Sequence, residues 1–136
     1  MASTLHFAVV TPGEVKFEGD AEIVVAPGAA GDLAALANHA PMVTTLRTGV
    51  LRATVAGQAR VEFAVKAGFM QILPDKVTVL TDIALAAADV DVEATRTELR
   101  QAEADLGGGR SGDDGTTRAA IAWANARLEV AHRTQA

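Results

Sequence analysis

Hydrophobic and polar residues alternate through much of the first half of the chain. Between residues 50 and 55, for example, Arg52 separates Leu51 from Ala53, as expected when successive side chains point to opposite faces of a sheet. Runs of this kind, separated by Gly- and Pro-containing turns, predict strands over residues 5–11, 14–17, 21–27, 50–55, 60–66, 69–73 and 77–82. No helical pattern lies between them, so the sequence predicts an all-β sandwich or barrel and not a parallel sheet of βαβ units.

The pattern changes near residue 87, where apolar residues begin to recur every three or four positions. This spacing marks one face of a helix and predicts helices over residues 91–106 and 117–133, with Asp91 as the N-cap of the first. The apolar stripes are Val92, Thr95, Leu99, Ala102 and Leu106 on the first helix, and Ile121, Ala124, Leu128 and Ala131 on the second. The Gly-rich segment 107–115 is expected to be a loop, because each glycine inside a helix costs about 1 kcal/mol relative to alanine. The chain is therefore divided into a β-sandwich domain, residues 1–87, and an antiparallel two-helix hairpin, residues 88–136.

Composition excludes several classes of function. The 136 residues include no cysteine, which rules out disulfides, thiolate metal sites and cysteine nucleophiles. The formal net charge of −5 argues against a nucleic-acid partner, since phosphate binding requires a basic surface. The N-terminus has no signal-peptide pattern, and no apolar run approaches the roughly 20 residues of a membrane span, so direct membrane insertion is not expected.

One run raises a choice between catalysis and recognition. Residues 28–49, GAAGDLAALANHAPMVTTLRTG, are mostly small and apolar but include Asp32 and His39, which would make an acid–base pair if the fold brought them together. No nucleophile motif accompanies them. His6 and His132 lie far from each other without a metal-site spacing, and the segment 107–115 lacks the lysine and hydroxyl residue of a phosphate loop, so neither metal nor cofactor is expected.

The same run resembles the loop signature of the ε subunit of F-type ATP synthases, in which a Gly-x-x-Gly-acid-Leu sequence leads into a His-Ala-Pro segment. The matching residues are Gly28, Gly31, Asp32, Leu33, Asn38, His39, Ala40, Pro41, Thr44, Leu46, Arg47 and Gly49. A second match, AVKAGFMQILPDKVTVLTDIA, extends the resemblance over nearly all of residues 3–88. The family has glycine where Asn38 stands and often where Ala67 stands. Asn38 is therefore expected in a left-handed backbone conformation, which asparagine tolerates better than most residues, and Ala67 is expected to be tolerable within a strand.

The resemblance implies a non-catalytic subunit in the rotating central stalk of a proton-translocating ATP synthase. Such a subunit links the γ subunit to the c-ring at the cytoplasmic face of the bacterial inner membrane. By position in the motif, the expected γ interface is His39, Pro41, Met42 and Thr44. The expected c-ring interface is Gly31, Asp32 and Leu33. A small, weakly charged run suits a tight interface, because charges are costly to bury there.

The resemblance also implies a regulatory role for the hairpin, which in the family extends toward the α/β catalytic head and slows ATP hydrolysis. The candidate inhibitory contacts are Arg118, Arg127 and Arg133, too sparse and too scattered around the helix for a strong brake. The positions of the family's nucleotide site are Val90, Asp91, Ala94 and Arg127. Ala94 stands where the family has arginine, so weak or no ATP binding is expected. A nucleotide-sensing module and an unrelated β-sandwich adaptor remain as alternatives.

Overall fold

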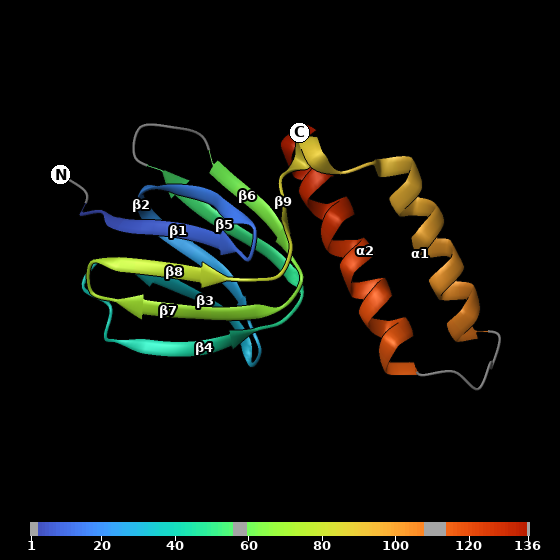
Figure 1. The fold of residues 1–136 in the computed structure, drawn as a ribbon, viewed down its shortest axis with the longest axis horizontal. Helices are drawn as coiled ribbons and strands as arrows, with labels where there is room; N and C mark the ends of the chain where they lie inside the picture. Colours follow the sequence, from blue (N-terminus) through green and yellow to red (C-terminus); the bar gives the residue numbers. More distant parts are fainter. Residues whose placement is uncertain (1–2, 56–59, 108–113, 136) are drawn as a thin grey trace.

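A computed structural model describes residues 3–55, 60–107 and 114–135 (Figure 1). The chain forms nine strands followed by a short 3₁₀ helix and two α-helices. Their bounds are β1 Leu5–Thr11, β2 Glu14–Gly28, β3 Gly31–Leu36, β4 Met42–Leu46, β5 Gly49–Val55, β6 Arg60–Val65, β7 Gly68–Leu73, β8 Lys76–Leu80, β9 Ala84–Leu85, η1 Ala87–Asp89, α1 Val92–Gly107 and α2 Asp114–Gln135. The predicted fold class, an N-terminal β-sandwich followed by a two-helix hairpin, is confirmed.

The strands form one continuous hydrogen-bonded sheet that folds over on itself in the order β1-β8-β7-β4-β2-β5-β6-β9, with β3 also paired to β2. The long strand β2 makes this possible, because its first half pairs with β1 and its second half pairs with β3 and β5. The two strands predicted over residues 14–17 and 21–27 are therefore one strand. Residues 18–20 lack an apolar alternation, but their pairing with β1 keeps them extended.

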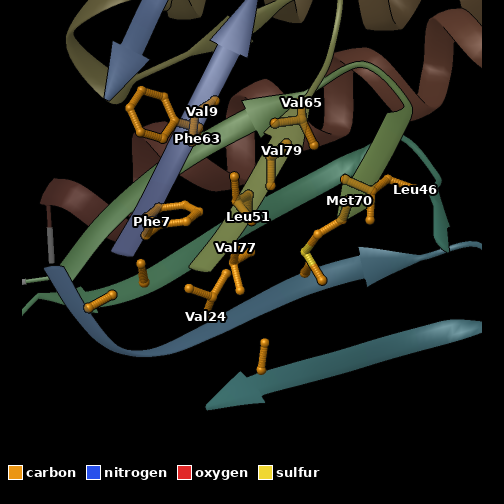
Figure 2. Close-up of a cluster of buried hydrophobic side chains, with 14 of the residues drawn as sticks. Phe7, Val9, Val24, Leu46, Leu51, Phe63, Val65, Met70, Val77 and Val79 are labelled. Carbon is orange, nitrogen blue, oxygen red and sulfur yellow. The ribbon is translucent and has the colours of Figure 1, made fainter. Parts of the chain in front are cut away.

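The core fills the space between the two layers (Figure 2). Alternate residues of the strands point inward, as in β5, where Leu51 and Ala53 are buried and Arg52 between them is not. The labelled core side chains in Figure 2 are Phe7, Val9, Val24, Leu46, Leu51, Phe63, Val65, Met70, Val77 and Val79. Phe17 joins this core from the side, with its ring centroid 5.6 Å from that of Phe7 and 6.5 Å from that of Phe63.

Both helices extend slightly into the segment 107–115, which was predicted to be a loop. Helix α1 runs through Gly107 and α2 already begins at Asp114, while residues 108–113 lie outside the described part of the chain. Asp91 caps α1 as predicted, because its Oδ1 accepts a hydrogen bond from the backbone N–H of Ala94 at 3.1 Å.

Helix α2 lies between α1 and the sandwich (Figure 1). On one side it packs against β5 and β6 through a small cluster of Ala64, Ala126 and Val130, flanked by Val50, Val90 and Trp123. On the other side it meets α1 through small residues, of which Ala102, Ala124 and Ala131 are buried. Within the described ranges, no helix is long and apolar enough to cross a membrane.

Candidate interaction surfaces

Asp32 and His39 lie at opposite ends of strand β3. Asp32 pairs with Pro27 near the start of the strand, and four residues later Leu36 pairs with Ile23 at its end. An extended strand rises about 3.3 Å per residue, so this interval alone spans roughly 13 Å. His39 lies still further along the chain. The hypothesis of an acid–base pair between Asp32 and His39 is therefore wrong.

Asp32 is held by Arg47, which the sequence indicated only as a position of the family signature. Arg47 Nη2 contacts Asp32 Oδ1 at 2.5 Å, and Arg47 Nη1 donates to the carbonyl oxygen of Gly28 at 2.5 Å. The backbone N–H of Arg47 also donates to the carbonyl oxygen of Pro27 at 2.9 Å. Arg47 thus ties the β2–β3 turn to the end of β4. The signal for this contact was present in the sequence as one acid and one base within the same signature.

His39 orders the loop that leads into β4. Its Nδ1 donates to the carbonyl oxygen of Ala40 at 2.7 Å, and its backbone N–H donates to the carbonyl oxygen of Leu36 at 3.2 Å. Asn38 has φ = +69°, which confirms the expected left-handed conformation. Its backbone N–H donates to the carbonyl oxygen of Pro74 at 2.7 Å, so the loop is tied to the β7–β8 turn.

Ala67 differs from its expected place within a strand. It lies between β6 and β7 with φ = +57°, a left-handed conformation that is costly for alanine. Gly68 follows with φ = +142°. The turn is held by Thr81, which is buried and whose Oγ1 donates to the carbonyl oxygen of Ala67 at 2.6 Å. The glycine that the resemblance leads us to expect at position 67 would adopt this conformation without that cost.

The other predicted γ-interface residues differ in exposure. Pro41 and Met42 are exposed, whereas Thr44 is half-buried. Alternation along β4 turns Val43 and Thr45 outward instead. Val43 is 69% exposed, the highest value among the large hydrophobic residues found exposed.

Val43 belongs to a row of apolar residues that crosses several strands on the outer face of the sandwich. Strand register places Phe69 opposite Leu80, Leu80 opposite Val10, and Val10 opposite Val15. Val43 lies on the same face of β4, two residues from Thr45, which is opposite Phe69. We call Val10, Val15, Val43, Phe69 and Leu80 the outer strip. Phe69 and Val15 are each 55% exposed and Leu80 is 49% exposed, so apolar surface faces solvent across neighbouring strands.

A hollow of about 600 Å³ opens beside the outer strip, at the ends of β1, β4 and β8. Val10, Pro12, Phe69 and Leu80 give it an apolar wall, while Lys66 and Asp82 supply opposite charges. Figure 1 shows β4, β7, β8 and β1 side by side across this face. Exposed apolar surface beside a hollow, with charges nearby, is typical of a protein-binding surface.

The hairpin uses most of its candidate site residues internally. Val90 packs against the small cluster between α2 and the sandwich, Asp91 caps α1, and Ala94 is exposed. Arg127 is bonded to Glu98 of α1, with Nη2 and Oε2 2.6 Å apart. Arg118 is exposed, and the side chain of Arg133 lies outside the described residues. Among the described residues, no group of three histidine or carboxylate side chains is placed to hold a metal ion.

Comparison with known proteins gives a consistent result. Residues 4–87 match the family described as the β-sandwich domain of the ATP synthase delta/epsilon chain. An ATP synthase epsilon chain from Herminiimonas arsenicoxydans is 38% identical over 135 residues, covering 98% of this chain and 96% of the relative. The corresponding chain from Parvibaculum lavamentivorans is 34% identical over 83% of this chain and 86% of the relative.

The fold is also similar to that of a chain in the mitochondrial ATP synthase of Euglena gracilis, in an assembly of OSCP, F1 and c-ring. The TM-score is 0.81 at 19% sequence identity, and the match covers 95% of this chain and 81% of that one. The family match spans more than half of the sequence, and relatives above 30% identity extend over most of it. The chain therefore belongs to the delta/epsilon chain family of ATP synthase, among the bacterial epsilon chains.

Proposed function

We propose that this chain is a central-stalk subunit of a proton-translocating F-type ATP synthase, where it links the γ subunit to the c-ring for rotational coupling. The single observation that carries the proposal beyond family membership is the outer strip, which exposes apolar side chains on strands that could otherwise present polar ones. Family membership itself excludes the alternative of an unrelated β-sandwich adaptor.

The outer strip is the proposed docking surface for γ. Its centre is Phe69, and the neighbouring hollow offers space for a side chain of the partner between Lys66 and Asp82. We propose His39, Pro41, Met42 and Thr44 as a second, separate part of the γ interface. Met42 pairs with the buried Ile72 and Thr44 with the buried Met70, so these two side chains lie on the face of β4 opposite to the outer strip. Aromatic residues such as phenylalanine are enriched at protein interfaces, and the residues that contribute most to binding lie near the centre of the interface.

The β2–β3 turn is the proposed contact with the c-ring. Gly31 and Asp32 are exposed and Leu33 is half-buried, so the tip of the turn offers a small surface with one acid. Arg47 fixes this tip relative to β4 by binding both the carboxylate of Asp32 and the carbonyl oxygen of Gly28, a pair of contacts that we call the Arg47 clasp. A fixed tip suits a part that transmits torque, because a turn that yields under load would lose the rotation it should pass on.

The subunit performs no chemistry in this proposal, and it sits at the cytoplasmic face of the bacterial inner membrane as a peripheral part of the complex. Its role is mechanical and requires a rigid sandwich. The nucleotide-sensing alternative is disfavoured because Ala94 offers no donor to a phosphate and Arg127 is already bonded to a carboxylate.

Co-purification tests the proposal. When the tagged chain is expressed in its own organism and extracted in mild detergent, we expect γ, the α/β head and the c-ring to elute with it. Recovery of the chain alone, under conditions in which the other subunits stay together, would contradict the role. The variant Leu36→Asp is the control, because it adds a charge at an exposed residue outside the outer strip. We expect this variant to co-purify with the complex as the unmodified chain does.

Removal of the hairpin should have a small effect on catalysis. We propose that its contact with the α/β head is transient, because Arg127 is engaged within the hairpin and Arg118 is nine residues away, on the opposite side of α2 at 100° per residue. Deletion of residues 89–136 from the assembled enzyme is expected to raise ATP hydrolysis about twofold, since a surface ion pair contributes about 0–1 kcal/mol and the middle of that range corresponds to about twofold. ATP synthesis by membrane vesicles should persist. A many-fold activation of hydrolysis would identify the hairpin as a strong brake.

A further inference from the structure

Arg127 is held by three contacts within the hairpin. Its side chain is 12% exposed, although arginine is rarely buried in proteins. One nitrogen, Nη2, lies 2.6 Å from Glu98 Oε2 on the other helix, and Nε donates to the carbonyl oxygen of Trp123 one turn earlier at 3.3 Å. The guanidinium carbon lies 5.1 Å from the centroid of the Trp123 ring, which is within the range of a cation–π contact.

The fully buried apolar residues between the two helices are small, while Leu99, Ile121 and Leu128 are only half-buried. The buried residues include Ala102, Ala124 and Ala131, which allow a close approach but bury little apolar area. Thr95 is also buried, but its Oγ1 donates to the carbonyl oxygen of Asp91 on its own helix. The bond between Arg127 and Glu98 therefore adds a directional, charged contact between α1 and α2 to this packing of small residues.

We propose that Glu98, Arg127 and Trp123 form a latch that keeps the hairpin closed without any bound ligand. Trp123 holds the guanidinium in place from α2, and Glu98 neutralises it from α1. If Glu98 moves away, a largely desolvated positive charge loses its counter-charge, which is costly. Opening of the hairpin must therefore break a charge-assisted bond and rehydrate Arg127 in one step. This inference concerns the hairpin itself and does not rest on the proposed role in the stalk.

The latch also connects the closure of the hairpin to its docking on the sandwich. Trp123 packs against the cluster of Ala64, Ala126 and Val130, so the residue that supports Arg127 is also part of the contact with β6. A nucleotide phosphate that bound Arg127 would have to displace Glu98. The closed state of this hairpin is accordingly independent of ATP.

Amide hydrogen exchange of the full-length protein tests the latch, because exchange from the open state reports rare openings. Glu98→Gln keeps the size of the side chain and removes its charge. We expect it to raise exchange rates about fivefold in both helices, which corresponds to about 1 kcal/mol, the upper end for an ion pair whose carboxylate is 58% exposed. The matched control is Glu93→Gln, which breaks the pair between Glu93 and Arg96 on α1 alone, 3.4 Å apart and much more exposed.

Two further measurements separate a latch from a local effect on α1. Trp123 is the only tryptophan of the chain, and its emission should shift to longer wavelength and become more accessible to acrylamide in Glu98→Gln but not in Glu93→Gln. The double variant Glu98→Gln/Arg127→Gln should exchange no faster than the faster single variant, because both changes break one bond. Addition of Mg-ATP to the unmodified protein should change neither exchange nor emission.

Equal exchange in Glu98→Gln and Glu93→Gln would overturn the latch, as would faster exchange confined to α1. Additive effects of the two substitutions in the double variant would show that Glu98 and Arg127 act separately. Protection of the hairpin by Mg-ATP would show that its closure depends on a ligand.

Discussion

Replacement of Phe69 with aspartate is expected to reduce the affinity for γ about 100-fold or more, while the sandwich remains folded. Phe69 lies at the centre of the outer strip, opposite Leu80 and next to the hollow. An aspartate there would lose the apolar contact and would bring a charge into the interface when γ docks, which is costly. Losses of 2 kcal/mol or more are typical at the centre of an interface, and about 2.7 kcal/mol corresponds to 100-fold in affinity.

The folded state should tolerate the change because the side chain of Phe69 is 55% exposed before γ binds. Titration of γ against the purified variant gives the affinity, and thermal unfolding monitored by circular dichroism gives the stability. Leu106→Asp is the matched control, since Leu106 is an exposed apolar residue near the end of α1, far from the outer strip in sequence and fold. Wild-type affinity in the Phe69 variant, or equal losses in both variants, would remove the outer strip from the proposed γ interface.

The outer strip shows that strand periodicity does not determine which face of a strand is buried. Alternation divides each strand into two faces, but it does not say which face is inside when both carry apolar residues. In β7, Phe69 and Met70 are adjacent and both apolar, yet Met70 is buried and Phe69 is exposed. That difference depends on the pairing of β7 with β4 and β8, which is non-local. The interface residues that the resemblance implies lie in the β2–β3 turn and around His39, and they include no residue of the outer strip.

The helices show the same limit in another form. The predicted stripe on α2 contains Ala124 and Ala131, which do face α1, but Ala126 and Val130 are also buried because α2 packs against the sandwich on its other side. Leu106, assigned to the apolar stripe of α1, is 37% exposed near the end of that helix. A helix between two partners has two buried faces, and a single 3.6-residue period describes only one of them.

Backbone conformation was predictable where residue chemistry pointed to it. Asparagine at a position that favours glycine indicated a left-handed conformation at Asn38, and the structure has it. Alanine does not by itself indicate a left-handed conformation, so the sequence predicted that Ala67 would be tolerated within a strand. The Arg47 clasp was missed for a related reason. Its partners Asp32 and Gly28 are distant in sequence, and only the turn geometry brings all three together.

Gly68 should be the least replaceable residue of the β6–β7 turn. A Cβ atom built on Gly68 would lie 2.2 Å from the carbonyl oxygen of Leu80 and 3.1 Å from Thr81 Cα, and both are backbone atoms that cannot rotate away. Its φ of +142° is in addition a conformation that other residues rarely adopt. Overpacking costs about 1–3 kcal/mol and a strained backbone conformation costs a similar amount, so Gly68→Ala is expected to destabilise the protein by about 3–5 kcal/mol.

The neighbouring substitution Ala67→Gly should act in the opposite direction and serves as the control. Glycine at φ = +57° relieves about 1–2 kcal/mol of left-handed strain, and the greater freedom of glycine in the unfolded chain offsets about 0.4–1 kcal/mol of it. The expected net gain is roughly 0.5 kcal/mol. Urea unfolding of both variants measures the two effects on one scale. If Gly68→Ala were as stable as the unmodified protein, Gly68 would not lie as close to the Leu80 carbonyl oxygen as described. If Ala67→Gly were destabilising, the turn would not be under strain.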